Sequence, residues 1–499
     1  MGGTTEQLRP LPPHHAKRLD RTLAGSVAWT AGAKWSSQIV SWACLLIVVR
    51  LLTPADFGLV AMAVIVFAYL TRVGTFGIPQ AIVTMRDLTD HQLAQLNTLS
   101  LMMGVTSFAL ACALAFPLGW FFRSPQLPLV FIVTCLGLLM MGLRNVSSGL
   151  LEKEMRFKRL AAFETAHTLT AAVVTLALAA LGFGYWALVV GNLAGTATRT
   201  ACMLALRRHG FAWLHFQSIK PALKLSWHVL VSWIAVDTYS RADNAIAGRV
   251  LGQTALGFYS FAWNLANIPL ERVTSLITIV VGTFLGVVRD DHTALRRYLC
   301  NLTEGIALIT FPSTVGLALV ARELIPFAMG SKWMGVVVPL ELLAVYAAIQ
   351  SIIALMPKVL MAIGQTRFWM WMELTALAVL PPAFYIGSRW GTAGIALGWA
   401  AIYPFIAAMV YWRTFKKIDL SFRSYYSALR PAVEGSVGMT ILVLAAKWFQ
   451  PAAWPLIVRL SIEVFSGAAA YILVILVFHR RRAMAFLRLA KTLRHASSP

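Results

Sequence analysis

The sequence predicts an all-α membrane protein with about fourteen transmembrane helices. Of its 499 residues, 59% are hydrophobic and only 13% are charged, whereas an average soluble domain has about 25% charged residues. The apolar residues are also gathered into runs of about 20, the length that a helix needs to cross the hydrocarbon core of a bilayer. Together these observations exclude soluble enzymes, coiled coils, disordered chains and secreted disulfide-linked domains.

The basic charge and the cysteines do not change this class. The net charge of +23 would indicate nucleic-acid binding only if the basic residues formed one patch, but they fall in short clusters between apolar runs. The five cysteines are odd in number and have no CxxC or metal-ligand spacing. We therefore expect no nucleic-acid partner, no disulfide framework, no metal site and no cofactor.

The predicted spans follow one another with short connections. A polar lead, 1–24, precedes a first apolar stretch that is too long for the apolar region of a cleavable signal peptide, which has about 7–15 residues. The fourteen spans are expected near 25–49, 57–80, 96–118, 129–149, 162–181, 185–205, 225–247, 257–287, 299–320, 334–356, 369–387, 391–412, 432–449 and 455–478.

The distribution of Lys and Arg predicts the orientation. With a cytoplasmic N-terminus, 29 of the 43 Lys and Arg residues fall in cytoplasmic segments and eight in outer loops. Such an excess over short loops is the positive-inside signal, so we expect both termini in the cytoplasm. The tryptophans of an aromatic belt are expected at the outer span ends, namely Trp120, Trp186, Trp333, Trp390, Trp448 and Trp454.

A weak internal repeat predicts two six-helix lobes. The stretch Arg50–Gly58 can be laid over Arg249–Gly257, with Arg and Gly eight positions apart in both. An even-numbered unit keeps its orientation, so the two lobes would be related by an axis along the membrane normal. The expected organisation is a cytoplasmic N-terminal segment at 1–24, an N-terminal lobe at 25–205, a cytoplasmic linker at 206–224, a C-terminal lobe at 225–412, a second cytoplasmic linker at 413–430, two additional helices at 431–478 and a basic cytoplasmic tail at 479–499.

Charged residues inside the spans are the candidate functional residues, because each costs ~2.5–3.5 kcal/mol to insert and usually faces a cavity or a partner. A cationic cavity between the lobes would bind an anionic group such as a phosphate or pyrophosphate. Its candidate residues are Lys34, Arg72, Arg144, Arg241 and Arg272. Candidate acids for coupling transport to a cation are Glu164, Glu373 and Asp237.

Several of these residues have a structural alternative. Arg144 lies near a span end and can extend its guanidinium to the inner interface instead. Asp237 and Arg241 are four residues apart, so an ion pair on one helix is favoured over substrate contact. Glu164 and Glu373 can equally join helices through hydrogen bonds.

Six short stretches resemble one known family. They are RLLTPADFGLVAMA (50–63), FGIPQAIV (76–83), RDLT (86–89), LEKEMRFKRL (151–160), GFGYWAL (182–188) and GQTALGFY (252–259). As a set they resemble the polysaccharide transporter family, the Wzx-type flippases of the MOP superfamily, and in particular its WzxC-like members. The resemblance covers most of residues 25–375.

The resemblance implies a MOP-type fold and a transport function. The implied substrate is an oligosaccharide repeat unit linked to undecaprenyl pyrophosphate, moved across the bacterial inner membrane for exopolysaccharide, capsule or O-antigen synthesis. Polysaccharide polymerase and export machinery are the implied partners. The family has no catalytic motif, so the resemblance implies no enzymatic activity.

Two other functions compete with a flippase. A cation-coupled exporter of the MATE type would favour an acidic cavity, and the basic first lobe argues against it. A membrane-embedded polymerase or ligase would carry a large outer loop, but the longest outer loop expected here has about a dozen residues. A channel would bring a filter motif, which is not found, and a scaffold without transport would leave the intramembrane charges unexplained.

Overall fold

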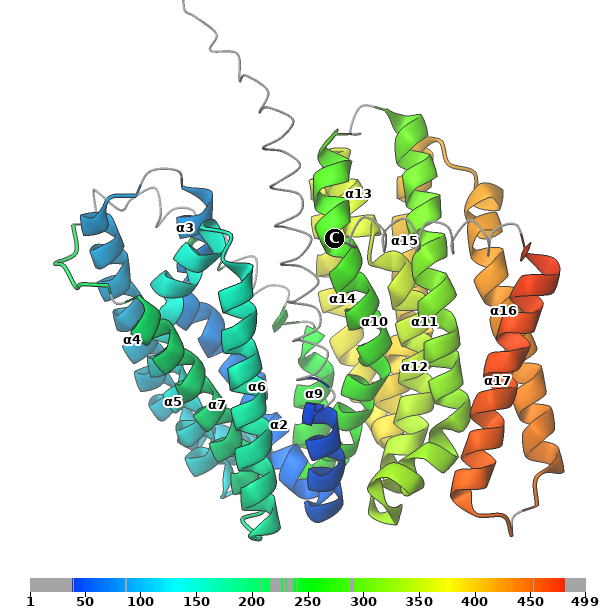
Figure 1. The fold of residues 1–499 in the computed structure, drawn as a ribbon, viewed down its shortest axis with the longest axis horizontal. Helices are drawn as coiled ribbons and strands as arrows, with labels where there is room; N and C mark the ends of the chain where they lie inside the picture. Colours follow the sequence, from blue (N-terminus) through cyan, green and yellow to red (C-terminus); the bar gives the residue numbers. More distant parts are fainter. Residues whose placement is uncertain are drawn as a thin grey trace, which may run out of the picture.

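The computed structural model describes residues 38–480 apart from 39, 86–87, 208, 216–225, 228–229, 231–236, 239, 288–290 and 452, and it gives no side-chain positions for 274–290, 292 and 366. Every element among the described residues is a helix. Figure 1 shows α3–α7 grouped on the left, α10–α15 grouped to their right, and α16 and α17 at the far right. We call α2–α7 the N-terminal bundle, α9–α15 the C-terminal bundle, and α16 with α17 the terminal pair.

The predicted spans 25–49 and 225–247 lie partly outside the described residues, and the other predicted spans fall on helices. The N-terminal bundle consists of α2 (Pro54–Thr75), α3 (Ile78–Thr84), α4 (Asp90–Phe122), α5 (Leu127–Lys153), α6 (Phe157–Ala180) and α7 (Tyr185–Leu206), preceded by an apolar helix, Val40–Leu51. The C-terminal bundle consists of α9 (Ala242–Ile246), η1 (Ala247–Leu251), α10 (Gln253–Val287), α11 (His292–Met329), η2 (Ser331–Val336), α12 (Val337–Ile353), α13 (Met356–Ala362), α14 (Thr366–Gly387), η3 (Ser388–Trp390) and α15 (Gly391–Ile418). The terminal pair consists of α16 (Phe422–Phe449) and α17 (Leu456–Phe478).

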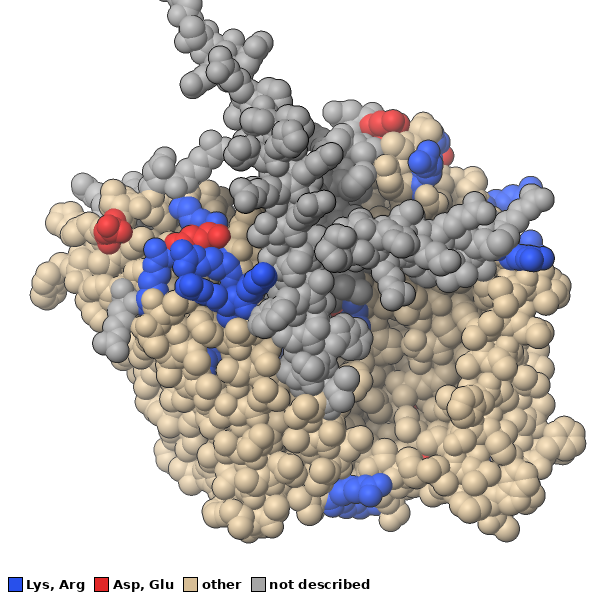
Figure 2. Space-filling model, viewed as in Figure 1, with Lys and Arg blue, Asp and Glu red and all other residues tan. Residues whose placement is uncertain are grey.

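The helices are apolar over lengths that suit a bilayer. Among the described residues, nine helical stretches are long and apolar enough to cross a membrane, and one of them, Arg367–Ile418, contains both α14 and α15. Figure 2 shows the same property from outside: Lys and Arg lie toward the upper and lower ends of this face, and the side chains between them are uncharged over most of the surface. The predicted all-α membrane fold is confirmed, while the number of spans stays a prediction.

The second predicted span, 57–80, is not one helix. Its helix α2 begins with a capping box, in which the Thr53 side chain accepts from the Asp56 amide and the Asp56 carboxylate accepts from the Thr53 amide. It ends at Phe76, whose left-handed backbone is followed by the left-handed Gly77. Two consecutive residues with positive φ cannot continue an α-helix, so a separate short helix, α3, follows.

The two bundles pack against each other at one end, which we call the outer end because it holds the turns 123–126 and 450–455 that the sequence predicts to lie outside (lower end in Figure 1). The glycine of each bundle's first long helix makes this contact possible. A Cβ atom on Gly58 would lie 1.8 Å from the backbone oxygen of Gln253, and one on Gly257 would lie 1.9 Å from that of Pro54. Only glycine permits so close an approach of α2 and α10.

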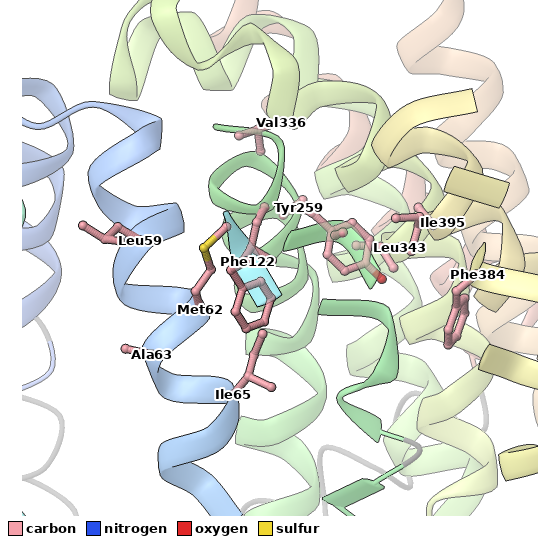
Figure 3. Close-up of a cluster of buried hydrophobic side chains, with 14 of the residues drawn as sticks. Leu59, Met62, Ala63, Ile65, Phe122, Tyr259, Val336, Leu343, Phe384 and Ile395 are labelled. Carbon is pink, nitrogen blue, oxygen red and sulfur yellow. The ribbon is translucent and has the colours of Figure 1, made fainter. Parts of the chain in front are cut away.

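One hydrophobic core crosses both bundles from the outer end toward the middle. It includes Met62 of α2, Phe122 of α4, Tyr259 of α10 and Phe384 of α14, which come from opposite sides of the boundary (Figure 3). Its centre is Trp333, with ring centroids 5.3 Å from Phe57 and 5.1 Å from Phe261.

Trp333 is therefore not a membrane-facing belt residue, and that prediction is wrong. The side chain is completely buried, and its indole nitrogen donates to the Val49 carbonyl at 3.0 Å. A tryptophan at a span end can turn inward when a buried acceptor is available. By contrast, Trp120, Trp390 and Trp448 are exposed, as a belt requires.

Basic side chains cap helix ends across the same boundary. Arg50 donates to the carbonyls of Ala328 and Phe327 at 2.9 and 2.6 Å, at the end of α11. Arg249 donates to the Phe121 carbonyl at 2.6 Å, at the end of α4. The last carbonyls of a helix lack partners within the helix and attract cations. Arg50 and Arg249 occupy equivalent positions in the repeat alignment. Each of them binds the end of a helix on the other side of the boundary.

The opposite, inner end has two separate cores. One lies within the N-terminal bundle and includes Ile78 and Leu96. The other lies in the C-terminal bundle and the terminal pair and includes Leu299, Met356 and Tyr425. Among the described residues no hydrophobic core joins the two bundles at this end.

The terminal pair is attached to α11 by buried charges. Glu323 accepts from Lys447 at 2.7 Å and from Arg459 at 2.9 Å, and Lys447 also lies 3.5 Å from Glu463. Glu323 and Glu463 are nearly or fully buried. Separating these residues would leave a buried charge without a partner, which is costly. The charged contacts therefore fix the position of the terminal pair against α11.

Candidate functional site

The first group of predicted residues lies where α2 meets the segment before α9. The Asp237 carboxylate lies 2.8 Å from Nε of Arg72 and 3.8 Å from Nε of Arg241, and the Tyr69 hydroxyl donates to the Asp237 backbone carbonyl at 3.2 Å. Asp237 is buried, while the two arginine side chains are about one-third exposed. The group therefore brings two guanidinium groups to one buried carboxylate.

The expected pair of Asp237 and Arg241 is present, and the structure adds a second partner. Asp237 does lie near Arg241 on its own segment, but the closer partner is Arg72 of the other bundle. These partners are 165 residues apart, so no local spacing reveals the pair. Because a buried carboxylate needs a close cation, Asp237 holds Arg72 in place at the boundary between the bundles.

A second group lies on α5, α6 and α7 of the N-terminal bundle. The guanidinium of Arg199 lies 2.7 Å from the Glu164 carboxylate, and Arg144 interacts electrostatically with both. Three buried nitrogen atoms of this group have no hydrogen-bond partner among the described residues: Nη1 of Arg144, Nε of Arg199 and Nδ1 of His167. Buried polar atoms are normally paired, so this group has unused hydrogen-bonding capacity.

Two glycines of α7 bring this group together. A Cβ atom on Gly195 would lie 2.7 Å from the His167 carbonyl, and one on Gly191 would lie 1.9 Å from Oγ1 of Thr175. The tight α6–α7 packing holds Arg199 beside Glu164. We call Arg72, Arg144, Arg199 and Arg241 together the basic group; it consists of two sets, one around Asp237 and one around Glu164.

Sequence reasoning placed Arg199 inside a span but did not assign it to the site. The missing information is the distance between α6 and α7, which no single helix pattern contains. A small residue at every fourth position, as at Gly191 and Gly195, indicates close helix packing in membranes and was the available signal.

The remaining predicted residues lie elsewhere. Arg272 is exposed on α10, and Glu373 lines a separate cavity of the C-terminal bundle together with Glu271. The predicted cavity residue Lys34 lies outside the described residues. The five predicted cations are thus not one group: Arg72 and Arg241 share Asp237, Arg144 lies with Arg199, and Arg272 is on the opposite bundle.

Comparisons with known proteins agree with the fold. A family model described as polysaccharide biosynthesis protein matches residues 47–338. The lipopolysaccharide biosynthesis protein WzxC of Escherichia coli (strain K12) is 23% identical over 419 residues, which cover 80% of this chain and 83% of WzxC. The succinoglycan biosynthesis transport protein ExoT of Rhizobium meliloti (strain 1021) is 24% identical over 487 residues, which cover 96% of this chain and 98% of ExoT.

Solved structures show the same architecture. The lipid II flippase MurJ, in an inward closed conformation, has a TM-score of 0.70 at 14% identity, with 91% of this chain and 100% of that chain covered. A multidrug resistance MATE family transporter of the MOP superfamily, in an inward-facing conformation, has a TM-score of 0.61 at 14% identity, with 77% and 94% covered. These likenesses confirm the expected MOP-type fold.

The family match extends over more than half of the chain and includes all six of the stretches that carry the resemblance. This chain belongs to the polysaccharide biosynthesis protein family.

Proposed function

We propose that this protein is a flippase that moves a polyprenyl-pyrophosphate-linked oligosaccharide repeat unit, of the undecaprenyl type, across the bacterial inner membrane. The observation that carries the proposal is the basic group, three of whose four arginines lie on the N-terminal bundle, within a family of polysaccharide biosynthesis proteins. Transport proteins among the relatives, such as ExoT, support transport over catalysis.

The chemistry of the basic group suits a pyrophosphate. Guanidinium groups present planar pairs of N–H donors that match phosphate oxygens. Arg144 and Arg199 each have a buried nitrogen without a partner among the described residues, which an anion would reach once the surrounding helices move apart. Four arginines face three acids in this group, namely Asp237, Glu164 and Glu152, of which Glu152 interacts electrostatically with Arg199. The arginines therefore outnumber the acids.

The acids also bear on coupling. Glu164 is paired with Arg199 and Asp237 with Arg72. We propose that both acids primarily orient their arginines. If a coupling cation binds to one of these acids, it takes the place of the arginine. The arginine that is displaced in this way would then be free to bind the substrate.

The proposed transport cycle is alternating access. The bundles share a core at the outer end and have separate cores at the inner end, which supports entry of substrate from the inner side. Rigid-body rotation of the bundles about their boundary would then separate the outer contacts and bring the inner ends together. We propose that the lobes comprise residues 25–205 and 225–412 and that both termini are cytoplasmic, as the 29-to-8 distribution of Lys and Arg supports.

The test is deletion of the gene followed by location of the lipid-linked sugar. Loss of surface polysaccharide, with repeat units protected from a membrane-impermeant reagent on the inner leaflet, is expected. Repeat units that reach the outer leaflet unpolymerised would contradict the proposal and indicate a later assembly step.

Charge-removing variants test the site itself. Arg144→Gln and Arg199→Gln should each reduce polysaccharide export at least about tenfold, since each loses a charge-assisted contact worth ~1.5–3 kcal/mol. The matched control is Arg389→Gln, at an exposed position of η3, which should export normally. Normal export by both site variants at normal protein levels would refute this assignment.

A further inference from the structure

A second cavity lies within the C-terminal bundle, apart from the basic group. It has a volume of 440 Å³ and is bordered by α10, α12, α13, α14 and α15, of which α10 and α14 stand on the side toward the N-terminal bundle (Figure 1). This volume falls in the ~300–1,000 Å³ range of small-molecule sites. No Lys or Arg is among the described residues that line it.

Aromatic rings form one wall of this cavity. Trp263 and Tyr403 line it, and both rest on two fully buried rings behind them. The Trp263 ring centroid lies 5.7 Å from Tyr346 and 5.4 Å from Trp399, and that of Tyr403 lies 5.1 Å from Tyr346. The wall thus has a buried back and a partly exposed front.

A buried carboxylate fixes the back of this wall. The Asp243 side chain accepts from the Trp399 indole nitrogen at 2.9 Å and from the Tyr259 hydroxyl at 2.7 Å, while its other oxygen accepts from the Asn244 amide at 2.6 Å. Asp243 is completely buried. A fully hydrogen-bonded buried group makes its neighbours rigid, so the aromatic wall is a preformed surface.

Polar groups lie around the same cavity. Asn267, Gln350, Glu271 and Glu373 contribute amides and carboxylates, and Trp369 adds a third lining ring on α14. The side-chain oxygen of Gln350 is buried and has no hydrogen-bond partner among the described residues. A ligand that donates hydrogen bonds would satisfy it.

We infer that this cavity binds a sugar ring of the lipid-linked oligosaccharide, an inference that rests on the proposed function. A sugar presents weakly positive C–H groups on its faces, which pack on the negative faces of aromatic rings. Its hydroxyl groups donate to carboxylates and amides around the edge. This chemistry is matched by the rigid aromatic wall, by the unsatisfied oxygen of Gln350 and by the polar side chains around the cavity.

The two bundles then bind opposite ends of one substrate. No Lys or Arg is among the described residues that line the cavity, so a pyrophosphate is attracted instead to the basic group, most of which lies on the N-terminal bundle. The sugar is uncharged or weakly charged by comparison and is accepted by the C-terminal bundle. Charge thus sets the orientation of the substrate, and the cavity sets preference among sugars.

The test is a binding comparison with the purified full-length protein. Three probes are used: polyprenyl pyrophosphate alone, the lipid-linked repeat unit extracted from host cells that lack the gene, and the free glycan released from it by mild acid. The wild type should bind the glycosylated lipid at least about tenfold more tightly than the bare lipid. An excess of free glycan should compete for the cavity and remove this extra affinity.

Variants in the cavity distinguish binding of the sugar from binding of the lipid pyrophosphate. Trp369→Leu, Gln350→Ala and Glu373→Gln should each lower the preference for the glycosylated lipid to about twofold while leaving the affinity for bare polyprenyl pyrophosphate unchanged. Arg144→Gln should lower both affinities. The matched control, Trp412→Leu on an exposed face of α15, should change neither.

Three outcomes would overturn the inference. One is a wild type that binds both lipids equally, and another is a set of cavity variants that keep the full preference. The third is binding of the organic cation tetraphenylphosphonium that Glu373→Gln abolishes and free glycan leaves unchanged, which would identify a cation site. Binding of neither lipid by the wild type would instead refute the proposed function.

Discussion

The outer and inner ends of the molecule are built differently. At the outer end, Trp333 and the glycine pair Gly58 and Gly257 join the two bundles through one core. At the inner end, each bundle has a core of its own, and several polar contacts there join parts of one bundle. Glu154, for example, accepts from Arg207 at the end of α7.

This difference indicates which contacts must change when the accessible side changes. The bundles can exchange neighbours at the outer end only by breaking shared contacts, whereas inner contacts within one bundle survive such a movement. Variants at the outer end should therefore alter which side is accessible. Variants at the inner end should alter stability alone.

The glycine contact should give the largest effect. In Gly58→Val and Gly257→Val, the new Cβ atom would lie less than 2 Å from a backbone oxygen of the facing segment. Because atoms cannot approach so closely, α2 and α10 must move apart. Export is expected to be lost, and a cysteine introduced at the buried Ser124 should react with an impermeant maleimide. Gly210→Val, where a Cβ meets open space, is the control. Wild-type export by both variants would show that the close contact is dispensable.

Removing the central aromatic ring should come second. Trp333→Ala deletes a completely buried side chain, a change that costs ~3–5 kcal/mol in a packed core. Because the lost contacts cross the bundle boundary, outer accessibility should rise together with the fall in thermal stability. Trp333→Phe keeps a ring in the core but loses the hydrogen bond to the Val49 carbonyl, so its effect should lie between wild type and Trp333→Ala. A stability loss in Trp333→Ala with unchanged labelling at Ser124→Cys would contradict a gating role.

The arginine caps should have a smaller effect. Arg50→Gln and Arg249→Gln each remove charged hydrogen bonds to the helix ends of the other bundle, worth ~1 kcal/mol at an exposed position. That corresponds to roughly a fivefold shift in the ratio of closed to open outer ends. Labelling rates at Ser124→Cys measure it, and the double variant should show the sum of both shifts. Opposite signs for the two single variants would argue against equivalent roles.

The inner ion pair should give the smallest effect, and one that depends on pH. Hydrogen bonding to Arg207, and the nearby charges of Arg207, Arg156 and Arg159, lower the pKa of Glu154 below its usual value. A lowered pKa means that the pair stabilises the folded protein above the unfolded pKa of about 4.3, and that this stability is lost as pH falls through the lower folded pKa.

Glu154→Gln should accordingly remove less than ~1 kcal/mol at neutral pH and flatten the acid dependence of thermal stability below about pH 5. Outer labelling should not change, since the contact joins only parts of the N-terminal bundle. A change in outer labelling with this variant would show that the inner end also communicates with the gate.

Helices and their apolar character followed from the sequence, because residues in lipid must satisfy their backbone within a helix. The break at Phe76 and Gly77 did not, since φ of a phenylalanine cannot be read from composition. Trp333 was misplaced for a related reason: a tryptophan at a span end has the same sequence pattern whether it faces lipid or a buried carbonyl.

The candidate site was predicted by residue type but not by arrangement. Arg72 and Arg144 stood out because charges are costly in membranes. Their partners depend on contacts between distant helices, as with Arg72 and Asp237. The aromatic cavity was missed altogether, because tryptophan and tyrosine within apolar runs look like ordinary core residues until Asp243 and Gln350 are placed beside them.

Transfer of lipid-linked oligosaccharide by the purified protein in liposomes tests the central claim most directly. The lipid would be supplied in both leaflets, and the fraction open to an impermeant sugar-oxidising reagent would be followed with time. A protein-dependent rise from about half toward complete reaction, reduced at least about tenfold by Arg144→Gln, is the result expected. No rise, in liposomes where the same protein transports tetraphenylphosphonium, would contradict the account.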